Sequence, residues 1–498
     1  MDGERQLFRH SAVELRQMIG AGEVSSVEVV TAFLERITEV NPALNAIVTL
    51  VPERALDEAR AADQARARGE HGGPLDGLPI AIKDLVDTAG IRTTYGSPLY
   101  RDHVPEADAA LVQRLRAAGA IVIGKTNTPE FGAGSHTFNP VFGVTRNPYD
   151  LGRTPGGSSG GAAAAVATGM LPFADGSDLG GSLRNPASFC NVVGLRPTPG
   201  RVPDPERNDL FDPLSVSGPI ARTVADTALL LGALAKPEAD TPLSMAAWSD
   251  APLDLRRHEV AQKEAGQKEV GQKKLAWSRD LGGLPVDPAV TAALEGARGI
   301  LEELGCAVVP AEPDLAEADE TFHVLRAIGF VRSLGAEVRA NPGAIKETVV
   351  WNVKEGLALD AERIARAQAT RTVLFRRMAT FLRTYDALAL PASLVPPFPV
   401  EEEWVHEIAG VKLSTYLDWM RACTRISVTA HPAISIPFAF TDDGLPVGLQ
   451  LVGRYGDERG LLQLAAAIEA AAGVYRRWPP MAPPTRAAAP GGEVEPGP

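Results

Sequence analysis

Apolar positions near the N-terminus recur every three or four residues, a spacing that predicts helices. Two of these segments open with the spacing of a capping box, at Ser11 and at Ser25. The second helix is expected to end at the Asn-Pro pair at 41–42, because the residue before a proline disfavours helical backbone. A third helix, rich in alanine and charge, is expected over about 52–68. We therefore interpret residues 1–70 as a helical lead-in.

Farther along the chain, short apolar runs alternate with amphipathic segments, which indicates an α/β layer architecture. The first run, 78–84, is expected to be a strand that delivers Lys83 at its far end. Further strands are expected over 120–123, 191–198, 385–390 and 434–440, and helices over 107–118, 287–304, 360–383 and 458–472.

Two segments depart from this alternation. Between 256 and 274, Gln-Lys-Glu and Gln-Lys-Lys triplets recur with a period of five, which suits neither a helix nor a strand. We interpret 256–274 as a solvated surface insertion with no function assigned. Residues 478–498 are rich in Pro, Ala and Gly and are expected to be a disordered tail. The catalytic part of the chain is thus expected to span 71–477.

Composition narrows the class of protein. The 498 residues are 45% hydrophobic and 22% charged, as in globular proteins, and the net charge of −13 argues against a broad nucleic-acid surface. The three cysteines are far apart and form no C-x-x-C pair, so we expect reduced thiols and no structural zinc. The absence of a leader-like start and of a long apolar run predicts a cytoplasmic protein without membrane attachment.

The most informative stretch is 155–186, where two glycine-flanked serine sites bracket a run of small residues expected to be a helix. Glycine on both sides of a serine indicates backbone that approaches something closely. A flexible linker is also rich in Gly and Ser. A linker, however, does not explain the alanine run, or the Asp178, Arg184, Asn185 and Cys190 that surround the second site.

Two other motifs compete for the function. Residues 119–126 match the phosphate-loop pattern G-x-x-x-x-G-K-T, but a helix precedes the first glycine and the intervening residues form the expected strand, which is the reverse of what such a loop needs. Ser158 and Ser159 each fit G-x-S-x-G, but loop residues precede them where an esterase elbow has a strand. The eight histidines are scattered, so a Ser-His-Asp triad has no obvious base.

A serine nucleophile without histidine needs another base, and a desolvated lysine is the usual substitute. Lys83 is the best placed, because burial at the end of an apolar strand lowers the pKa of a lysine. The alternative is that Lys83 caps a strand at the surface, which is the commoner fate of lysines. The serine clusters favour the catalytic interpretation.

The chain at this point resembles the amidase signature family, from Ser11 to about Ala472. The resemblance rests on G-L-P-I-A-I-K-D at 77–84, G-K-T-N-x-x-E-F at 124–131, P-G-G-S-S-G-G at 155–161, G-S-D-L-G-G-S-L-R-N-P at 176–186, Cys190, G-L-R-P-T at 194–198 and G-L-P-x-G-L-Q at 444–450. Ser177 and Asn191 depart from it, where the family often has threonine and glycine.

The resemblance implies a Ser–cisSer–Lys triad. Ser182 would be the nucleophile, Lys83 the base for acylation, and Ser158 the carrier of the proton between them, with a cis peptide between Gly157 and Ser158. Asp178 and Arg184 are expected to pair and hold the loop. The implied oxyanion hole is made of the backbone N–H groups of Leu179, Gly180, Gly181 and Ser182, and the implied acyl pocket of Phe131, Gly132, Ala133 and Gly134.

The resemblance also implies one large α/β domain around a mixed, mostly parallel sheet flanked by helices on both faces. The expected activity is hydrolysis of a carbon–nitrogen acyl bond of a small linear amide, with anilides, esters and carbamates as open alternatives, and without a cofactor or metal. We expect no nucleic-acid or membrane partner, with a homodimer as a candidate assembly. Two alternatives remain open: the glutamine-hydrolysing component of a tRNA-dependent amidotransferase (its A subunit), and a non-catalytic binding module.

Overall fold

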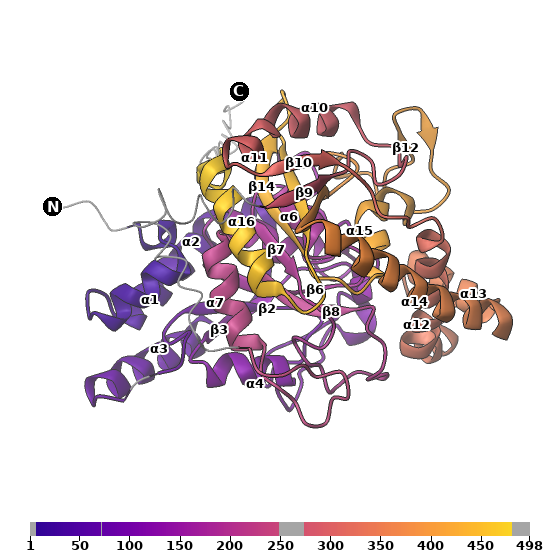
Figure 1. Ribbon diagram of the computed structural model, residues 1–498. Coiled ribbons are helices and arrows are strands. Elements are labelled where there is room, and N and C mark those ends of the chain that lie inside the picture. The colour runs from indigo at the N-terminus through magenta and orange to yellow at the C-terminus, as the bar shows by residue number, and fades with distance from the viewer. Residues whose placement is uncertain (1–5, 71, 249–272, 481–498) are drawn as a thin grey trace, which may run out of the picture.

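A central sheet of eight strands organises the computed structural model, which describes residues 6–70, 72–248 and 273–480 (Figure 1). The strands are short, and apart from the edge strand β10 (Ala307–Pro310) nearly all of their residues are buried, as expected for a sheet covered on both faces. In sheet order they are β10 (Ala307–Pro310), β9 (Lys274–Trp277), β11 (Ala387–Pro391), β15 (Pro446–Val452), β14 (Ala433–Phe440), β7 (Val193–Arg196), β8 (Val216–Ala221) and β6 (Phe173–Asp178).

The sheet is mixed, as expected, but the prediction that it is mostly parallel is wrong. Strand β9 runs parallel to β10 and β11, whereas the other five pairings are antiparallel. The reason lies partly in the connections. Strands β14 and β15 are joined by the short turn at 441–445, and so short a connection can only reverse the chain, since a parallel neighbour needs a crossover of a dozen residues or more.

A second sheet of three strands, in the order β1-β3-β2, lies against β6 of the large one. Strand β2 (Pro79–Lys83) pairs parallel with β3 (Ile121–Thr126), and β1 (Ile47–Leu50) pairs antiparallel with β3. Strand β1 belongs to the lead-in, which is therefore not purely helical. The helical periodicity of that region gave no signal for a strand of four residues.

The lead-in helices are α1 (Ala12–Gly20), α2 (Ser26–Leu44) and α3 (Pro52–Ala67). Both predicted capping boxes are present, at Ser11 and Ser25. The predicted end of α2 at 41–42 is wrong, because the helix continues through Pro42 to Leu44. A proline in the last turn costs one backbone hydrogen bond, and the Asn41 side chain accepts bonds from the N–H groups of Ala46 and Ile47 just beyond the helix.

Helices cover both faces of the large sheet (Figure 1). On one face, α7 (Val224–Leu234), α10 (Pro288–Ala297) and α16 (Glu458–Ala472) pack on residues such as Ile434 and Leu449 in the largest hydrophobic cluster. On the other face, the sheet is contacted by α5 (Gly160–Ala167) and α6 (Arg184–Phe189), each of which begins just after one of the two serine sites. The remaining helices are α4 (Ala110–Ala117), α11 (Gly299–Glu303), α12 (Ala318–Ala340), α13 (Glu347–Leu357), α14 (Ala361–Thr384) and α15 (Arg421–Ser427).

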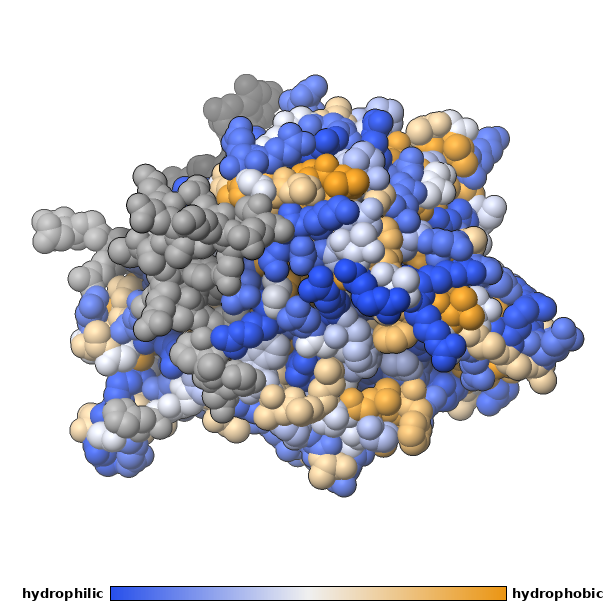
Figure 2. Space-filling model, in the orientation of Figure 1, coloured by the Kyte–Doolittle hydropathy of each residue, from blue (hydrophilic) through white to orange (hydrophobic). Residues whose placement is uncertain are grey.

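The surface is mostly polar. Figure 2 shows hydrophilic residues over most of the viewed face, with apolar residues in separate small groups, as is usual for a face in water. Among the described residues, no helix is both long enough and apolar enough to cross a bilayer. The predicted insertion, up to residue 272, and most of the predicted tail lie outside the described residues; β9 begins at Lys274, inside the predicted limits of the insertion.

Candidate active site

Lys83 ends strand β2 and is fully buried beneath the serine sites. Its Nζ atom lies 2.8 Å from Ser158 Oγ, 2.9 Å from Ser159 Oγ and 3.0 Å from Ser177 Oγ. Burial lowers the pKa of Lys83 to about 7, although the charges of Asp175 and Asp178 oppose this shift. At neutral pH a large share of this amine is therefore uncharged.

Asp175 ties Lys83 to the large sheet. Its Oδ1 accepts a hydrogen bond of 2.8 Å from the backbone N–H of Lys83, which joins β2 to β6. Burial raises the pKa of Asp175, while that N–H group and the nearby lysines lower it. The carboxylate thus fixes the backbone at Lys83, and the Nζ atom is held by hydroxyl groups.

Ser158 lies at the entrance of α5 and follows a cis peptide bond with Gly157, as the resemblance implied. Two side chains hold this turn from outside: Ser135 Oγ donates to Gly157 O at 2.6 Å, and Thr137 Oγ1 donates to Gly156 O at 2.8 Å. The turn is tightly packed, because a Cβ atom on Gly157 would lie 3.1 Å from the backbone of residues 135–136. Close backbone approach therefore favours glycine at this position.

Ser182 lies on the loop between β6 and α6 and is half-buried. Its carbonyl accepts a hydrogen bond of 3.2 Å from the N–H of Ser159, so the two serine sites are joined directly. Within the loop, the N–H groups of Gly181 and Leu183 donate to Asp178 at 2.8 and 3.1 Å. The N–H of Gly181 is therefore engaged by a carboxylate.

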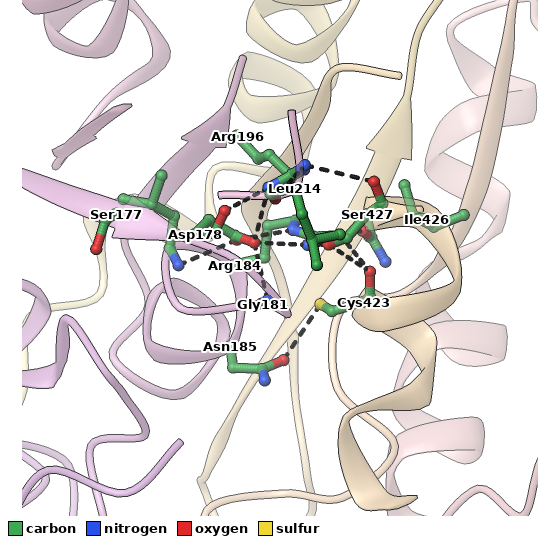
Figure 3. A network of polar contacts seen from close by, with 12 residues as sticks. Ser177, Asp178, Gly181, Arg184, Asn185, Arg196, Leu214, Cys423, Ile426 and Ser427 are labelled. Carbon is green, nitrogen blue, oxygen red and sulfur yellow. Dashed lines mark hydrogen bonds and ion pairs between the residues drawn. The ribbon is translucent and has the colours of Figure 1, made fainter. Parts of the chain in front are cut away.

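The predicted pairing of Asp178 with Arg184 is present, at the centre of a fully buried network (Figure 3). Arg196 also donates to the Asp178 carbonyl, and Arg184 donates to Gln450 Oε1 at 2.6 Å. Burial opposes ionisation of Asp178, but the charges of Arg184 and Arg196 outweigh it and hold its pKa well below the usual range. Asp178 thus stays ionised at neutral pH and holds the Ser182 loop.

A cavity that is open to solvent at its mouth brings the candidate residues together. Ser158 and Ser182 both line it, and so do Phe131, Gly132 and Gly134. Ala133 lies behind this wall, fully buried in a cluster with Phe330, Ile345 and Val349. The pocket residues implied by the resemblance therefore divide into three that contact the cavity and one that supports them.

Helix α12 provides much of the opposite wall, through Phe322, Arg326 and Phe330. The four-residue spacing places these three side chains on one face of the helix. Of the part of the chain that the structure describes, no histidine and no acidic residue lines this cavity. A Ser-His-Asp arrangement is therefore not formed here.

Comparison with known proteins shows the family to which the chain belongs. The family model described as Amidase matches residues 28–462, most of the chain. The chain belongs to the amidase signature family. A solved bacterial aryl acylamidase of the amidase signature family superimposes with a TM-score of 0.85 at 27% identity, over 94% of this chain and 98% of that one. The 6-aminohexanoate cyclic dimer hydrolase superimposes with a TM-score of 0.83 at 29% identity, over 95% of this chain and 99% of that one.

Relatives within the family differ in activity. The chain is 39% identical to the A subunit of the glutamyl-tRNA(Gln) amidotransferase of Moorella thermoacetica, over 95% of this chain and 99% of that protein. It is 36% identical to an acylamidase of Rhodococcus erythropolis, over 94% of this chain and 96% of that protein. Family membership thus establishes an amidase signature enzyme, and the relatives leave its individual substrate open.

The phosphate-loop match at 119–126 is explained by the amidase signature fold. Its residues form β3, as the sequence predicted, and Lys125 is buried. The Lys125 Nζ atom donates to Val86 O and to the hydroxyls of Thr88 and Thr93. This lysine therefore holds the segment after β2 in place.

Sequence reasoning missed three site residues. Ser159 and Ser177 contact Lys83 as closely as Ser158 does, and Arg326 lies in the cavity wall. Ser159 adjoins Ser158, so the doubled serine was a usable signal. Arg326 lies 144 positions beyond Ser182, in a variable region expected to supply part of the pocket, but no motif singled it out.

Proposed function

We propose that this enzyme hydrolyses a carbon–nitrogen acyl bond of a small amide through an acyl-enzyme on Ser182. The observation that carries the proposal is the position of the Lys83 amine, fully buried and 2.8 Å from Ser158 Oγ. With its pKa lowered to about 7 by burial, Lys83 can act as a base at neutral pH. Linear amides are the expected substrates, with anilides, esters and carbamates open to the same chemistry.

In the proposed reaction, Ser182 Oγ attacks the substrate carbonyl carbon while its proton passes to Ser158, whose own proton passes to Lys83 Nζ. The tetrahedral intermediate collapses when the same relay returns the proton to the leaving nitrogen, which departs as the amine. A water molecule then attacks the acyl-enzyme and releases the acid. In this second step the relay takes a proton from the water and returns one to Ser182 Oγ, so Lys83 gains a proton and gives it up once in each half-reaction.

The oxyanion of the intermediate would be held by backbone N–H groups of the loop Leu179, Gly180, Gly181 and Ser182. Because the N–H of Gly181 already donates to Asp178, we assign the main contacts to Leu179, Gly180 and Ser182. Leu179, Gly180 and Ser182 line the cavity, which supports this assignment.

The second candidate is the glutamine-hydrolysing component of a tRNA-dependent amidotransferase, favoured by the 39% identity to the Moorella thermoacetica protein. Glutamine carries an ammonium group on its acyl side, and a buried ammonium needs an anionic partner. Among the described residues that line the cavity, none is acidic. We therefore favour an enzyme that acts without partner proteins on amides that lack this ammonium.

The test uses the purified chain alone. We expect it to release nitroaniline from acyl nitroanilides and to become labelled at Ser182 by a fluorophosphonate probe, with no labelling of Ser182→Ala. If the chain instead hydrolyses glutamine, and only when partner proteins are added, it is the amidotransferase component. A chain that neither reacts with the probe nor turns over any amide, ester or carbamate would be a binding module.

A further inference from the structure

Arg326 differs from the other buried arginines of the described chain. Arg184 and Arg196 contact Asp178, and Arg201 contacts Glu458 at 3.0 Å. Arg326 is only 6% exposed, yet no carboxylate of the described residues lies within ion-pair distance of it. A buried charge without a counter-ion is unfavourable, so a partner for this guanidinium is missing from the chain itself.

Neutral groups fix the guanidinium in one position. Its Nε atom donates to Asn352 Oδ1 at 3.2 Å, and one terminal nitrogen donates to the Tyr416 hydroxyl at 2.6 Å. Asn352 also donates to that hydroxyl at 2.6 Å, and the Phe330 ring lies 4.5 Å from the guanidinium carbon. The other terminal nitrogen has no protein partner among the described residues, and Arg326 lines the same cavity as Ser182.

The surroundings restrict what can reach this nitrogen. The cavity that Ser182 and Arg326 both line also has three aromatic side chains in its wall, Phe131, Phe322 and Phe330. Phe131 packs against the same cluster as Phe330, so Arg326 lies on the side of the cavity assigned to the acyl group. A short methylene chain suits the aromatic wall, and a carboxylate suits a fixed guanidinium.

We propose that Arg326 recognises a carboxylate at the far end of the acyl group, so that the preferred substrates are half-amides of short dicarboxylic acids. This inference rests on the proposed function and names its substrate class. Glutamine shares the carboxylate but adds an ammonium, for which the cavity wall has no acidic partner among the described residues.

The experiment compares matched nitroanilides in which a terminal carboxylate replaces a methyl group: succinyl with butanoyl, glutaryl with pentanoyl, and adipoyl with hexanoyl. A charge-assisted hydrogen bond contributes about 1.5–3 kcal/mol, which corresponds to a preference of about 10- to 100-fold in kcat/KM for the carboxylate at the chain length that fits. Arg326→Gln should remove this preference, by lowering kcat/KM for the carboxylate substrate far more than for its neutral partner. Arg326→Lys should restore part of it.

Arg339→Gln is the matched control, an exposed arginine farther along the same helix that should leave the preference unchanged. Equal rates for charged and neutral acyl groups at all three lengths would overturn the inference while the proposed function stands. An equal loss of both activities in Arg326→Gln would assign this residue a structural role only and would also overturn it. A preference for carboxylates on the aniline ring would place the anion on the leaving-group side and refute the acyl assignment.

Binding separates this inference from the proposed function. Calorimetry on Ser182→Ala should show glutaramate binding at least about 10-fold more tightly than pentanamide, and the added Arg326→Gln substitution should abolish the difference. If that difference is seen and no amide is hydrolysed, the anion site stands and the proposed function fails. If Ser182→Ala binds both ligands equally, or binds neither, the anion site is refuted.

Discussion

The Nζ atom of Lys83 lies 2.8 Å from Ser158 Oγ, and Lys83 is fully buried. Because burial lowers the pKa of Lys83 to about 7, only its neutral form, which accumulates above that pH, can accept the proton. We expect kcat/KM for a neutral amide to rise with pH and to level off above an apparent pKa near 7. A pH–rate profile of the free enzyme measures this, and full activity retained at pH 5 would contradict the assignment of the base.

The three proposed triad residues should differ in how much activity their loss removes. Ser182→Ala should abolish turnover because it removes the nucleophile, and Lys83→Ala should abolish detectable turnover at neutral pH. Ser158→Ala should leave weak residual activity, about 10²- to 10⁴-fold below wild type, which is the usual contribution of a proton-transfer group. Single-turnover kinetics with a nitroanilide measure all three.

Ser177→Ala is the control for this series, because its hydroxyl is 3.0 Å from Lys83 and lines the same cavity but carries no proton in the proposed relay. We expect it to retain activity within about tenfold of wild type, since losing one neutral hydrogen bond costs about 1 kcal/mol. If Ser177→Ala is as impaired as Ser158→Ala, the relay does not run through Ser158 alone.

Lys83 should also make stability depend on pH. Its pKa is about 7 in the folded protein and near 10.4 in an unfolded chain, so between these values the unfolded state binds more protons. The contribution of Lys83 to the free energy of unfolding therefore rises with pH across this window, by about 1.4 kcal/mol per unit, and is smallest below pH 7. Urea unfolding of wild type and Lys83→Met should show that the substitution raises the free energy of unfolding most at pH 6. This increase should shrink towards pH 9. An increase in the free energy of unfolding that does not depend on pH would refute the lowered pKa of Lys83.

Asp178 should be critical for stability, because its removal leaves Arg184 and Arg196 buried without their shared carboxylate. We expect Asp178→Asn to lower the free energy of unfolding by about 3–5 kcal/mol. Glu362→Gln, in an exposed pair with Arg366 at 3.9 Å, should change it by less than about 1 kcal/mol. Denaturant unfolding of both variants checks this, and similar small effects would mean that the network is replaceable.

Gly161 in α5 should not tolerate alanine. A Cβ atom there would lie 2.5 Å from the backbone nitrogen of Asn127 and 2.7 Å from the carbonyl oxygen of Ala46. Gly161→Ala should therefore destabilise the protein by about 1–3 kcal/mol through overpacking. Gly296→Ala is the control: it lies in α10 with open space around it and should stabilise by about 0.5–1 kcal/mol. Thermal unfolding would contradict this explanation if the two variants behaved alike.

Local patterns predicted local structure well. The capping boxes at Ser11 and Ser25 form, α14 and α16 fall within one residue of their predicted limits, and the alanine-rich run is the buried helix α5. These features depend on residues a few positions apart. Strand β1 was missed because its partner, β3, lies some 75 positions away, and the strand order of the large sheet was beyond any local signal.

The sequence by itself determined which residues are candidates for chemistry: the two glycine-flanked serine sites, the lysine at the end of an apolar strand, and the pairing of Asp178 with Arg184. Only the tertiary structure decided what surrounds them. The burial that lowers the pKa of Lys83 comes from β6 and α5, and the cavity wall opposite Ser182 comes from α12. Chain order records spacing along the backbone, whereas desolvation and cavity shape depend on segments that meet only when the sheet has formed.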